Sequence, residues 1–302
     1  MSILVVGSVA LDNLETPHGK REGVLGGTAT NFSAAASFFT SVHMIGVVGL
    51  DFGDEHMEFL IKKGIDISGL RVDPTGKTFR WTGRYFDDVN QRETLDTQLG
   101  VFANFDPELS ESQRELPFIF LAGVHPPLQL KVIEQAKNPK IVAMDTWMRE
   151  IELHRDVLQK VIERSDMLFV NDEEARKLTG EINVVKAAKK ILSWGPKVAV
   201  IKRGEYGALL YTKDMVFAVP GMPLSKVVDP TGAGDTFAGG FMGCIASAED
   251  LSEKTLRRAV IYGSAMASFQ VEDFGLDRLR TLTWQEIESR MKLFKELSHF
   301  EL

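Results

Sequence analysis

Residues 229–235 read Asp229-Pro230-Thr231-Gly232-Ala233-Gly234-Asp235, and the run of mostly small residues Thr236-Phe237-Ala238-Gly239-Gly240-Phe241-Met242-Gly243 follows directly. The glycines predict a loop that opens into the N-terminus of a helix, and the small residues allow that helix to pack closely on its neighbours. The unpaired N–H groups of a helix N-terminus converge where the helix dipole adds about half a positive charge. This loop is therefore a candidate phosphate-binding site.

Asp235 stands at the start of the predicted helix. Phosphoryl transfer needs a carboxylate within reach of the attacking hydroxyl, together with positioning and charge neutralisation. The helix N-terminus favours an ionised carboxylate, so Asp235 is predicted to be ready to accept a proton near neutral pH. Asp is also a preferred N-cap residue, so a helix cap is the alternative interpretation of Asp235 alone.

Outward from this loop, short apolar runs alternate along the chain with amphipathic segments. The apolar runs have the length and composition of buried parallel strands and cover residues 3–6, 44–48, 118–121, 141–144, 167–170 and 198–201. The amphipathic segments predict helices over residues 54–63, 128–136, 151–163 and 184–194. This alternation predicts an α/β fold with a doubly wound sheet. Open α/β sheets bind ligands at the carboxyl ends of their strands, where Asp145, Asn171 and Lys202 stand.

Residues 77–87 and 91–102 carry β-type side chains on either side of Asp87-Asp88-Val89-Asn90 and predict a hairpin. A hairpin that interrupts a βαβ series does not easily join the parallel sheet. We therefore expect it to pack as a small flap with the segment near residues 13–24. It is a candidate lid or dimer surface, and an ordinary edge hairpin is the alternative.

The composition excludes several partners. The chain has 302 residues, a formal net charge of -7 and no block of Lys or Arg, so neither nucleic acid nor an anionic membrane is an expected partner. The N-terminus has no signal-peptide pattern and no apolar run is long enough to span a membrane, which predicts a cytoplasmic location. The single cysteine, Cys244, lies in an apolar run and is expected to be a core thiol.

The pattern Asp-x-Thr-Gly-Ala-Gly-Asp followed by Thr-Phe-x-Gly-Gly-Phe resembles the second signature of the ribokinase-like (PfkB) carbohydrate kinase family. Further landmarks follow the family order along nearly the whole chain. The resemblance implies a ribokinase-like three-layer doubly wound sheet with a small β lid, in one domain over residues 1–302. The lid insertions fall at about residues 12–24 and 72–105. It also implies that Asp235 is the catalytic base and that the amides of Gly232, Ala233 and Gly234 form an anion hole.

Substrate residues follow from the same resemblance, position by position. Gly7-Ser8-Val9-Ala10-Leu11-Asp12 and Gly26-Gly27-Thr28-Ala29-Thr30-Asn31 resemble the family's substrate-binding loops. Where many sugar kinases read Asp-x-Asn-x-Arg, this chain reads Asp145-Thr146-Trp147-Met148-Arg149, so Trp147 replaces the Asn. Ribokinase has a Lys at the position of Thr28, which speaks against ribose. The implied substrate-binding residues are Asp12, Gly26, Gly27, Asn31 and Arg149.

Nucleotide and metal residues are implied in the same way. Asn171-Asp172-Glu173-Glu174 matches Asn-x-x-Glu, so Asn171 and Glu174 would hold Mg²⁺ through water, which is compatible with a helix cap at Asn171. Lys202 is a candidate phosphate contact, with a solvated lysine as the alternative. Asp229 and Thr231 would join a K⁺-like cation. The implied nucleotide-binding residues are Asn171, Lys202, Gly204, Gly207, Thr231, Gly232 and Gly234.

The sequence thus predicts a sugar kinase that transfers the γ-phosphate of ATP to a hydroxyl, with Mg²⁺ and with K⁺ as a further candidate cofactor. A nucleoside kinase of the adenosine or cytidine type, with the same fold and base, is the alternative. A ligand-binding regulator without catalysis is an alternative of another class. A homodimer through the lid is expected, because the lid often forms the dimer interface in this family.

Overall fold

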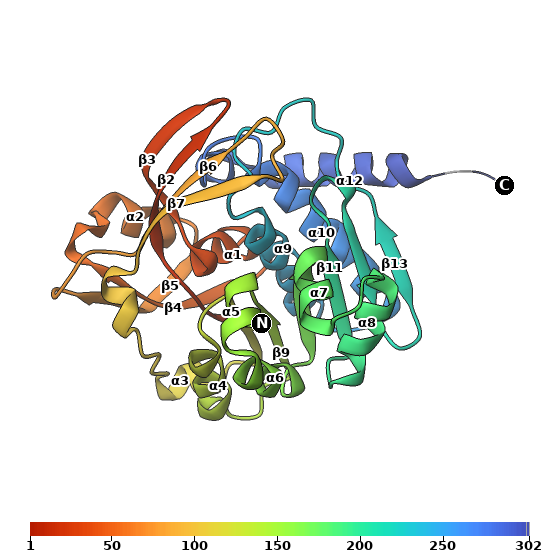
Figure 1. Cartoon of the computed structure of the whole chain (residues 1–302), viewed down its shortest axis with the longest axis horizontal. Coiled ribbons are helices and arrows are strands. Elements are labelled where there is room, and N and C mark those ends of the chain that lie inside the picture. Colours follow the sequence, from red (N-terminus) through yellow and green to blue (C-terminus); the bar gives the residue numbers. More distant parts are fainter. Residues whose placement is uncertain (300, 302) are drawn as a thin grey trace.

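A nine-stranded sheet forms the centre of the computed structural model, which describes residues 1–299 and 301 (Figure 1). In spatial order its strands are β13 (Val216–Val219), β12 (Ala208–Tyr211), β11 (Val198–Lys202), β10 (Met167–Asn171), β9 (Ile141–Asp145), β8 (Phe118–Leu121), β1 (Ser2–Val6), β4 (Ser41–Gly49) and β5 (Ile65–Asp73). All neighbours from β11 to β5 pair in parallel, and β12 and β13 add antiparallel pairs at one edge. The chain order reverses at β1, so a ligand crevice is expected at the carboxyl ends of the strands around β1.

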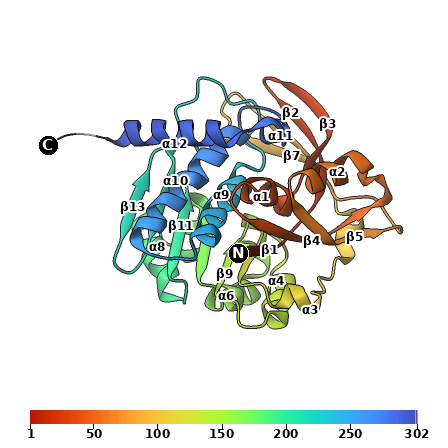
Figure 2. The same ribbon diagram turned by 180° about the vertical axis from the view of Figure 1, so that it is seen from behind.

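Helices cover both faces of this sheet and make three layers (Figures 1 and 2). Ile3 and Val5 of β1 join a core cluster that includes residues of α1, α9 and α10, whereas Leu4 and Val6 join the cluster packed by α4, α6, α7 and α8. Successive strand residues point to opposite faces, which is why these strands are apolar throughout. The helices are α1 (Thr28–Ala36), α2 (Asp54–Lys62), α3 (Glu111–Arg114), α4 (Pro126–Gln135), α5 (Met148–Leu153), α6 (Arg155–Glu163), α7 (Asp172–Thr179), α8 (Val184–Ser193), α9 (Ala233–Ala248), α10 (Glu253–Gln270), α11 (Asp277–Thr281) and α12 (Trp284–Ser298).

A second, four-stranded sheet stands beside the carboxyl ends of the main strands. Its order is β3 (Gly19–Gly26), β2 (Ala10–Thr16), β6 (Arg80–Tyr85) and β7 (Arg92–Gln98). The predicted hairpin is the antiparallel pair β6–β7, and it joins the segment near residues 13–24 through the parallel pair β2–β6. This sheet is the small β lid predicted from the sequence, whereas the limits of the two lid insertions and the single domain stay predictions.

Helix α9 packs unusually close to its neighbours. A Cβ atom on Gly239 would lie 2.3 Å from the carbonyl oxygen of Phe32 in α1, and one on Gly240 would lie 2.8 Å from Met266 Cγ in α10. A Cβ on Gly243 would lie 2.8 Å from the Phe39 ring. A side chain at Gly239 would require the α1 backbone to shift, and one at Gly240 or Gly243 would displace a packed side chain, so the glycines fix where α9, and with it Asp235, stands in the core.

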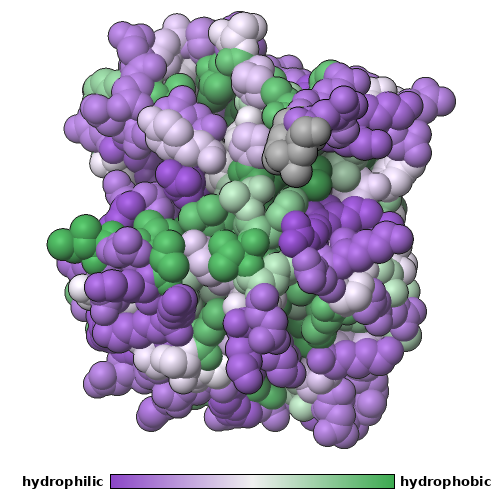
Figure 3. Space-filling view, turned by 90° about the vertical axis from the view of Figure 1, so that its right-hand side faces the viewer, coloured by the Kyte–Doolittle hydropathy of each residue, from purple (hydrophilic) through white to green (hydrophobic). Residues whose placement is uncertain are grey.

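The six predicted strands and three of the four predicted helices are present. The predicted helix over 151–163 is wrong: the chain breaks at His154 (φ −131°, ψ 32°) into α5 and α6. Strands β5, β12 and β13 were not predicted. Cys244 is buried, as expected. Apolar side chains gather in a band on the face shown in Figure 3, yet none of the described helices is long and apolar enough to cross a membrane.

Candidate active site

The loop 229–235 lies next to a predicted substrate-binding residue. Gly232 precedes α9 with φ 74°, a left-handed conformation that favours glycine. A Cβ atom there would lie 2.4 Å from Asn31 Nδ2, and the same nitrogen donates to the carbonyl of Gly27 at 3.0 Å. The predicted anion loop therefore lies directly against Asn31, a predicted substrate-binding residue that is itself hydrogen-bonded to a second one, Gly27. Gly232, and not Asp235, is the N-cap residue of α9, so the helix-cap interpretation of Asp235 is wrong.

Lys202 is held in the site by a carboxylate. Its Nζ lies 2.5 Å from Asp145 Oδ2, and the side chains are 16% and 5% exposed. Asp145 ends β9 and Lys202 ends β11, with Asn171 beside Lys202 at the end of β10. A Cβ atom on Gly234 would lie 3.1 Å from Lys202 Nζ, so the ammonium group reaches the anion loop. The solvated-lysine interpretation is therefore wrong.

Burial, rather than the helix dipole, dominates the charge state of Asp235. The protein packed around it removes water from its carboxyl group, and with the charge of Asp145 raises its pKa to about 7, against an opposing effect of Lys202. Burial and then Asp145 also raise the pKa of Glu174 to about 7. Burial alone would lower the pKa of Lys202, but the charges of Asp145 and Glu174 outweigh the effect of burial, so the pKa of Lys202 is raised. The sequence had suggested that Asp235 is ionised at neutral pH. With a pKa of about 7 it is instead only partly ionised there and can exchange a proton.

Asp12 provides a second carboxyl group in the site. It is buried, and a Cβ atom on Gly26 would lie 2.2 Å from its Oδ2. Burial, followed by the charge of Asp229, raises the pKa of Asp12 to about 7. Among the described residues its Oδ1 is buried without a hydrogen-bond partner. Such an atom is costly unless something binds it, so Asp12 is suited to take a ligand hydroxyl.

Substituting Asp12 with Asn is expected to stabilise the free protein while weakening acceptor binding. The raised pKa means that the folded state holds this proton to higher pH than the unfolded chain, so the carboxyl group destabilises the fold above about pH 4 and most strongly above about pH 7. Asn removes this penalty. Urea unfolding should show a gain of about 1–3 kcal/mol near pH 8 that disappears near pH 4. A pH-independent difference, or a loss near pH 8, would contradict the assignment.

Asn171 and Glu174 form a reciprocal pair. The Asn171 N–H donates to Glu174 Oε2 at 2.8 Å, and the Glu174 N–H donates to Asn171 Oδ1 at 2.7 Å. This capping box starts α7, so the predicted helix cap is confirmed. Burial, followed by the charge of Asp145, raises the pKa of Glu174 and Asp235, and the single ammonium group of Lys202 opposes this rise only in part. An all-oxygen, net negative donor set of this kind fits Mg²⁺.

The predicted monovalent-cation residues are already bonded to protein groups. Asp229 accepts from the N–H groups of Thr231 and Gly275, each at 2.9 Å. The buried Gln270 amide donates to the carbonyls of Thr231, at 3.2 Å, and Gly275, at 2.5 Å. These bonds join the anion loop to the loop after α10 through the carboxylate oxygens of Asp229 and the carbonyl of Thr231. Activation by K⁺ stays a prediction, which exchange for sodium or caesium would test.

The lid reaches the anion loop through residues that the sequence did not identify. The hydroxyl groups of Thr231 and Tyr85 lie 3.1 Å apart, and Arg92 faces Tyr85 across the β6–β7 pair. The Arg92 guanidinium acts against the rise in the pKa of Asp235 and Glu174, so its positive charge acts on the site. The lid turn also contacts the loop after β11, where Asn90 Nδ2 lies 3.4 Å from Glu205 Oε1. The cross-strand placement of Tyr85 and Arg92 could have indicated their shared face.

The remaining predicted residues lie at the margin. Gly204 and Gly207 flank the short 3₁₀ turn Gly204–Tyr206 after β11, and both have left-handed φ values, 54° and 85°. Arg149 lies in α5 and is exposed, two residues after Trp147. Phe79 stacks on Phe102 with ring centroids 5.6 Å apart, so Phe79 serves lid packing. Trp147 keeps 38% of its surface exposed and is free to contact a ligand.

The site combines a carboxyl group with a pKa of about 7, a glycine loop at a helix N-terminus and a buried Lys–Asp pair, as phosphoryl transfer requires. The family model described as "pfkB family carbohydrate kinase" matches residues 3–281. The chain therefore belongs to the PfkB family and is a kinase of the ribokinase type.

Three known proteins illustrate the similarity. A cytidine kinase of Thermococcus kodakarensis is 31% identical over 260 residues, which are 84% of this chain and 91% of the relative. A candidate ribokinase II of Escherichia coli, solved with ATP and Mg²⁺, has a TM-score of 0.82 at 21% identity, covering 97% and 99% of the two chains. A Burkholderia thailandensis nucleoside kinase solved with inosine has a TM-score of 0.79 at 22% identity and 98% coverage of both.

Proposed function

We propose that this kinase transfers the γ-phosphate of ATP to a hydroxyl group on the ribose of a nucleoside. The sequence favoured a sugar as acceptor and kept a nucleoside as the alternative. The relative at 31% identity is named a cytidine kinase, and the protein solved with inosine is a nucleoside kinase. These names support the nucleoside alternative over the sugar.

The observation that carries the proposal is the buried, unpartnered Oδ1 of Asp12. Asp12 is close enough to Asp235 for the Asp235 charge to contribute to its raised pKa, and Gly26 lies against it. A hydroxyl group bound to Asp12 would satisfy this atom and hold the acceptor near the base. Asn31, which lies against Gly232 of the anion loop, and Gly27, whose carbonyl accepts a hydrogen bond from Asn31, would bind the same sugar.

Each other residue has a role in this proposal. Asp235 removes the proton of the attacking hydroxyl as general base. The amides of Gly232, Ala233 and Gly234, with Lys202, bind the transferred phosphoryl group. Asn171 and Glu174 would hold Mg²⁺ through water, and the ion would neutralise phosphate charge. Arg92 adds a positive charge from the lid, while Thr231 and the turn at Gly204 and Gly207 lie on the nucleotide side.

Trp147 supports a nucleoside acceptor. It begins the segment that continues into α5, directly after Asp145 and Thr146, and replaces a polar residue of many sugar kinases. An aromatic ring stacks on a nucleobase but has less to contact on a bare sugar. Trp147 and Arg149 are therefore proposed to contact the base, and a Trp147→Asn variant should lose more affinity for nucleosides than for ribose.

A homodimer through the lid is also proposed. All residues of β7 are exposed, and this strand is an edge of the lid sheet. Exposed edges readily pair with another chain. Light scattering at micromolar concentration tests this point, and a monomer would count against it.

The test of function is a coupled ADP-release screen with Mg-ATP over nucleosides, pentoses, hexoses and phosphosugars. We expect turnover on at least one nucleoside with a kcat/KM at least about 10²-fold above that on any free sugar. A sugar as the best acceptor would overturn the nucleoside proposal but leave the kinase. Turnover on no acceptor, together with tight nucleoside binding by calorimetry, would favour the non-catalytic regulator.

A further inference from the structure

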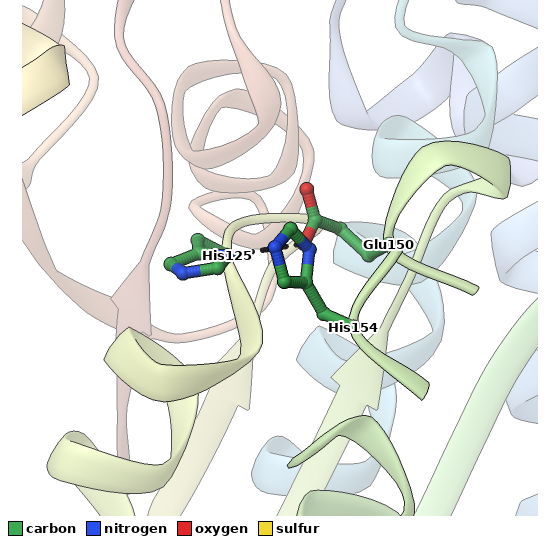
Figure 4. A group of neighbouring side chains, drawn as sticks. All are labelled: His125, Glu150 and His154. Atoms are coloured by element: carbon green, nitrogen blue, oxygen red, sulfur yellow. Dashed lines mark hydrogen bonds and ion pairs between the residues drawn. The ribbon is translucent and has the colours of Figure 1, made fainter. Parts of the chain in front are cut away.

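Two histidines and a glutamate converge where the loop before α4 meets α5 (Figure 4). His125 stands in the loop between β8 and α4, Glu150 lies within α5, and His154 ends that helix. The Nδ1 atoms of His125 and His154 lie 3.1 Å and 2.7 Å from the same Glu150 oxygen, Oε2. All three ligand atoms lie within 4.8 Å of one another. Side chains from two separate elements thus point at one place.

Glu150 needs a positive partner. Its side chain is only 4% exposed, and within the described residues its ion-pair partners are these two histidines, with no Lys or Arg. A buried carboxylate without a cation is unfavourable, and neutral imidazoles compensate it only by hydrogen bonds. A divalent cation between the three atoms would replace the shared protons and neutralise the charge.

The ligand set selects the class of metal. Two imidazoles and one carboxylate form the three-ligand set of open zinc sites, in which water takes the fourth position. Glu150 and His154 are four residues apart on one helical turn, a spacing at which two side chains reach one ion. His125 and His154 are 44% and 35% exposed, which leaves room for that water and for entry of the ion.

We propose that His125, Glu150 and His154 bind one Zn²⁺-class transition-metal ion. The ion joins the loop after β8 to α5, the helix that directly follows Trp147. A Cβ atom on Gly123, two residues before His125, would lie 4.0 Å from Trp147 Cδ1, so the loop after β8 runs beside the Trp147 segment. The bound metal therefore holds the Trp147 segment in place. Metal binding uses none of the residues proposed to act in phosphoryl transfer, whereas its effect on Trp147 rests on the proposed function.

The test uses the full-length protein without a histidine tag, stripped with a chelator. Titration with Co²⁺, a spectroscopic substitute for Zn²⁺, is expected to give visible d–d absorption that saturates at one equivalent. His125→Ala, His154→Ala and Glu150→Gln should each weaken binding at least about 10²-fold. His18→Ala, which alters an exposed histidine in the lid turn, is the matched control and should keep one equivalent.

Thermal unfolding provides the second measurement. Zn²⁺ at about 100 times its dissociation constant should raise the Tm of the wild type by roughly 5 °C and leave that of His125→Ala unchanged. His125→Ala alters the most exposed ligand, so it separates loss of binding from loss of folding. Absence of d–d absorption, or binding retained in both histidine variants, would show a hydrogen-bonded cluster only and overturn the proposal.

Discussion

Replacing Asp235 with Asn is expected to lower kcat about 10²- to 10⁴-fold on whichever acceptor the kinase uses. Asn has nearly the same shape, so the anion loop and α9 should stay in place, but its amide cannot accept the proton of the attacking hydroxyl. The acceptor KM should change little, because the lost interaction acts in the transition state. Steady-state assays with a coupled ADP readout measure both constants.

The pH dependence gives the same assignment an independent check. The pKa of Asp235 is raised to about 7 by burial and by Asp145, and a base works only when deprotonated. Wild-type kcat/KM should therefore fall as pH drops below about 7, with an apparent pKa shared by the carboxyl groups of the site. Asp54→Asn, which changes an exposed aspartate at the start of α2, is the matched control. Near wild-type turnover in Asp235→Asn would refute the general base.

Substituting Lys202 with Met is expected to destabilise the fold by about 3–5 kcal/mol, since it leaves a buried carboxylate unpaired. Asp145 loses the ammonium group at 2.5 Å, and Glu174 loses the positive charge that acts most strongly on it. Protonation of Asp145 removes its unpaired charge and so relieves part of the destabilisation. The loss of stability should therefore be larger near pH 8 than near pH 5. Urea unfolding at the two pH values measures it.

Two controls make this result specific. Lys197→Met removes an exposed lysine that pairs with Asp166 at 2.8 Å, and should change stability by less than about 1 kcal/mol. The double variant Lys202→Met/Asp145→Asn should recover part of the stability, because Asp145 no longer carries a charge. Glu174 and Asp235 still lack the ammonium group, and the variant should remain a poor kinase. A single Lys202→Met variant as stable as the control would mean that the pair is well solvated.

The sequence predicted the parallel strands because each is buried on both faces and reads as a continuous apolar run. It missed β12 and β13, which have only four residues each, and β5, whose residues are mostly polar or half-buried. The helix break at His154 left no signal, because the apolar spacing continues into α6. These elements depend on what the tertiary structure packs against them, which a local pattern does not record.

The candidate site divides in the same way. The resemblance to family motifs located Asp12, Asn31 and Asp235, and the last two also follow glycines at a fixed spacing. The Lys202–Asp145 pair depends on the register of β9, β10 and β11, and the contact of Tyr85 with Thr231 depends on how the lid closes over the loop. The charge of Asp235 was misjudged because the helix N-terminus is visible in the sequence while the burial of its carboxyl group is not.

The tight seating of α9 has a consequence for how this protein can vary. Gly239 and Gly240 touch α1 and α10 where no side chain fits, one or two turns below the base. A methyl group at Gly239 would push the helix outward and move Asp235 with it, and displacements of about 1 Å lower turnover markedly. Substitutions at these glycines, which touch no ligand, would then lower catalytic activity. The interior of this enzyme is constrained by its chemistry as well as by its stability.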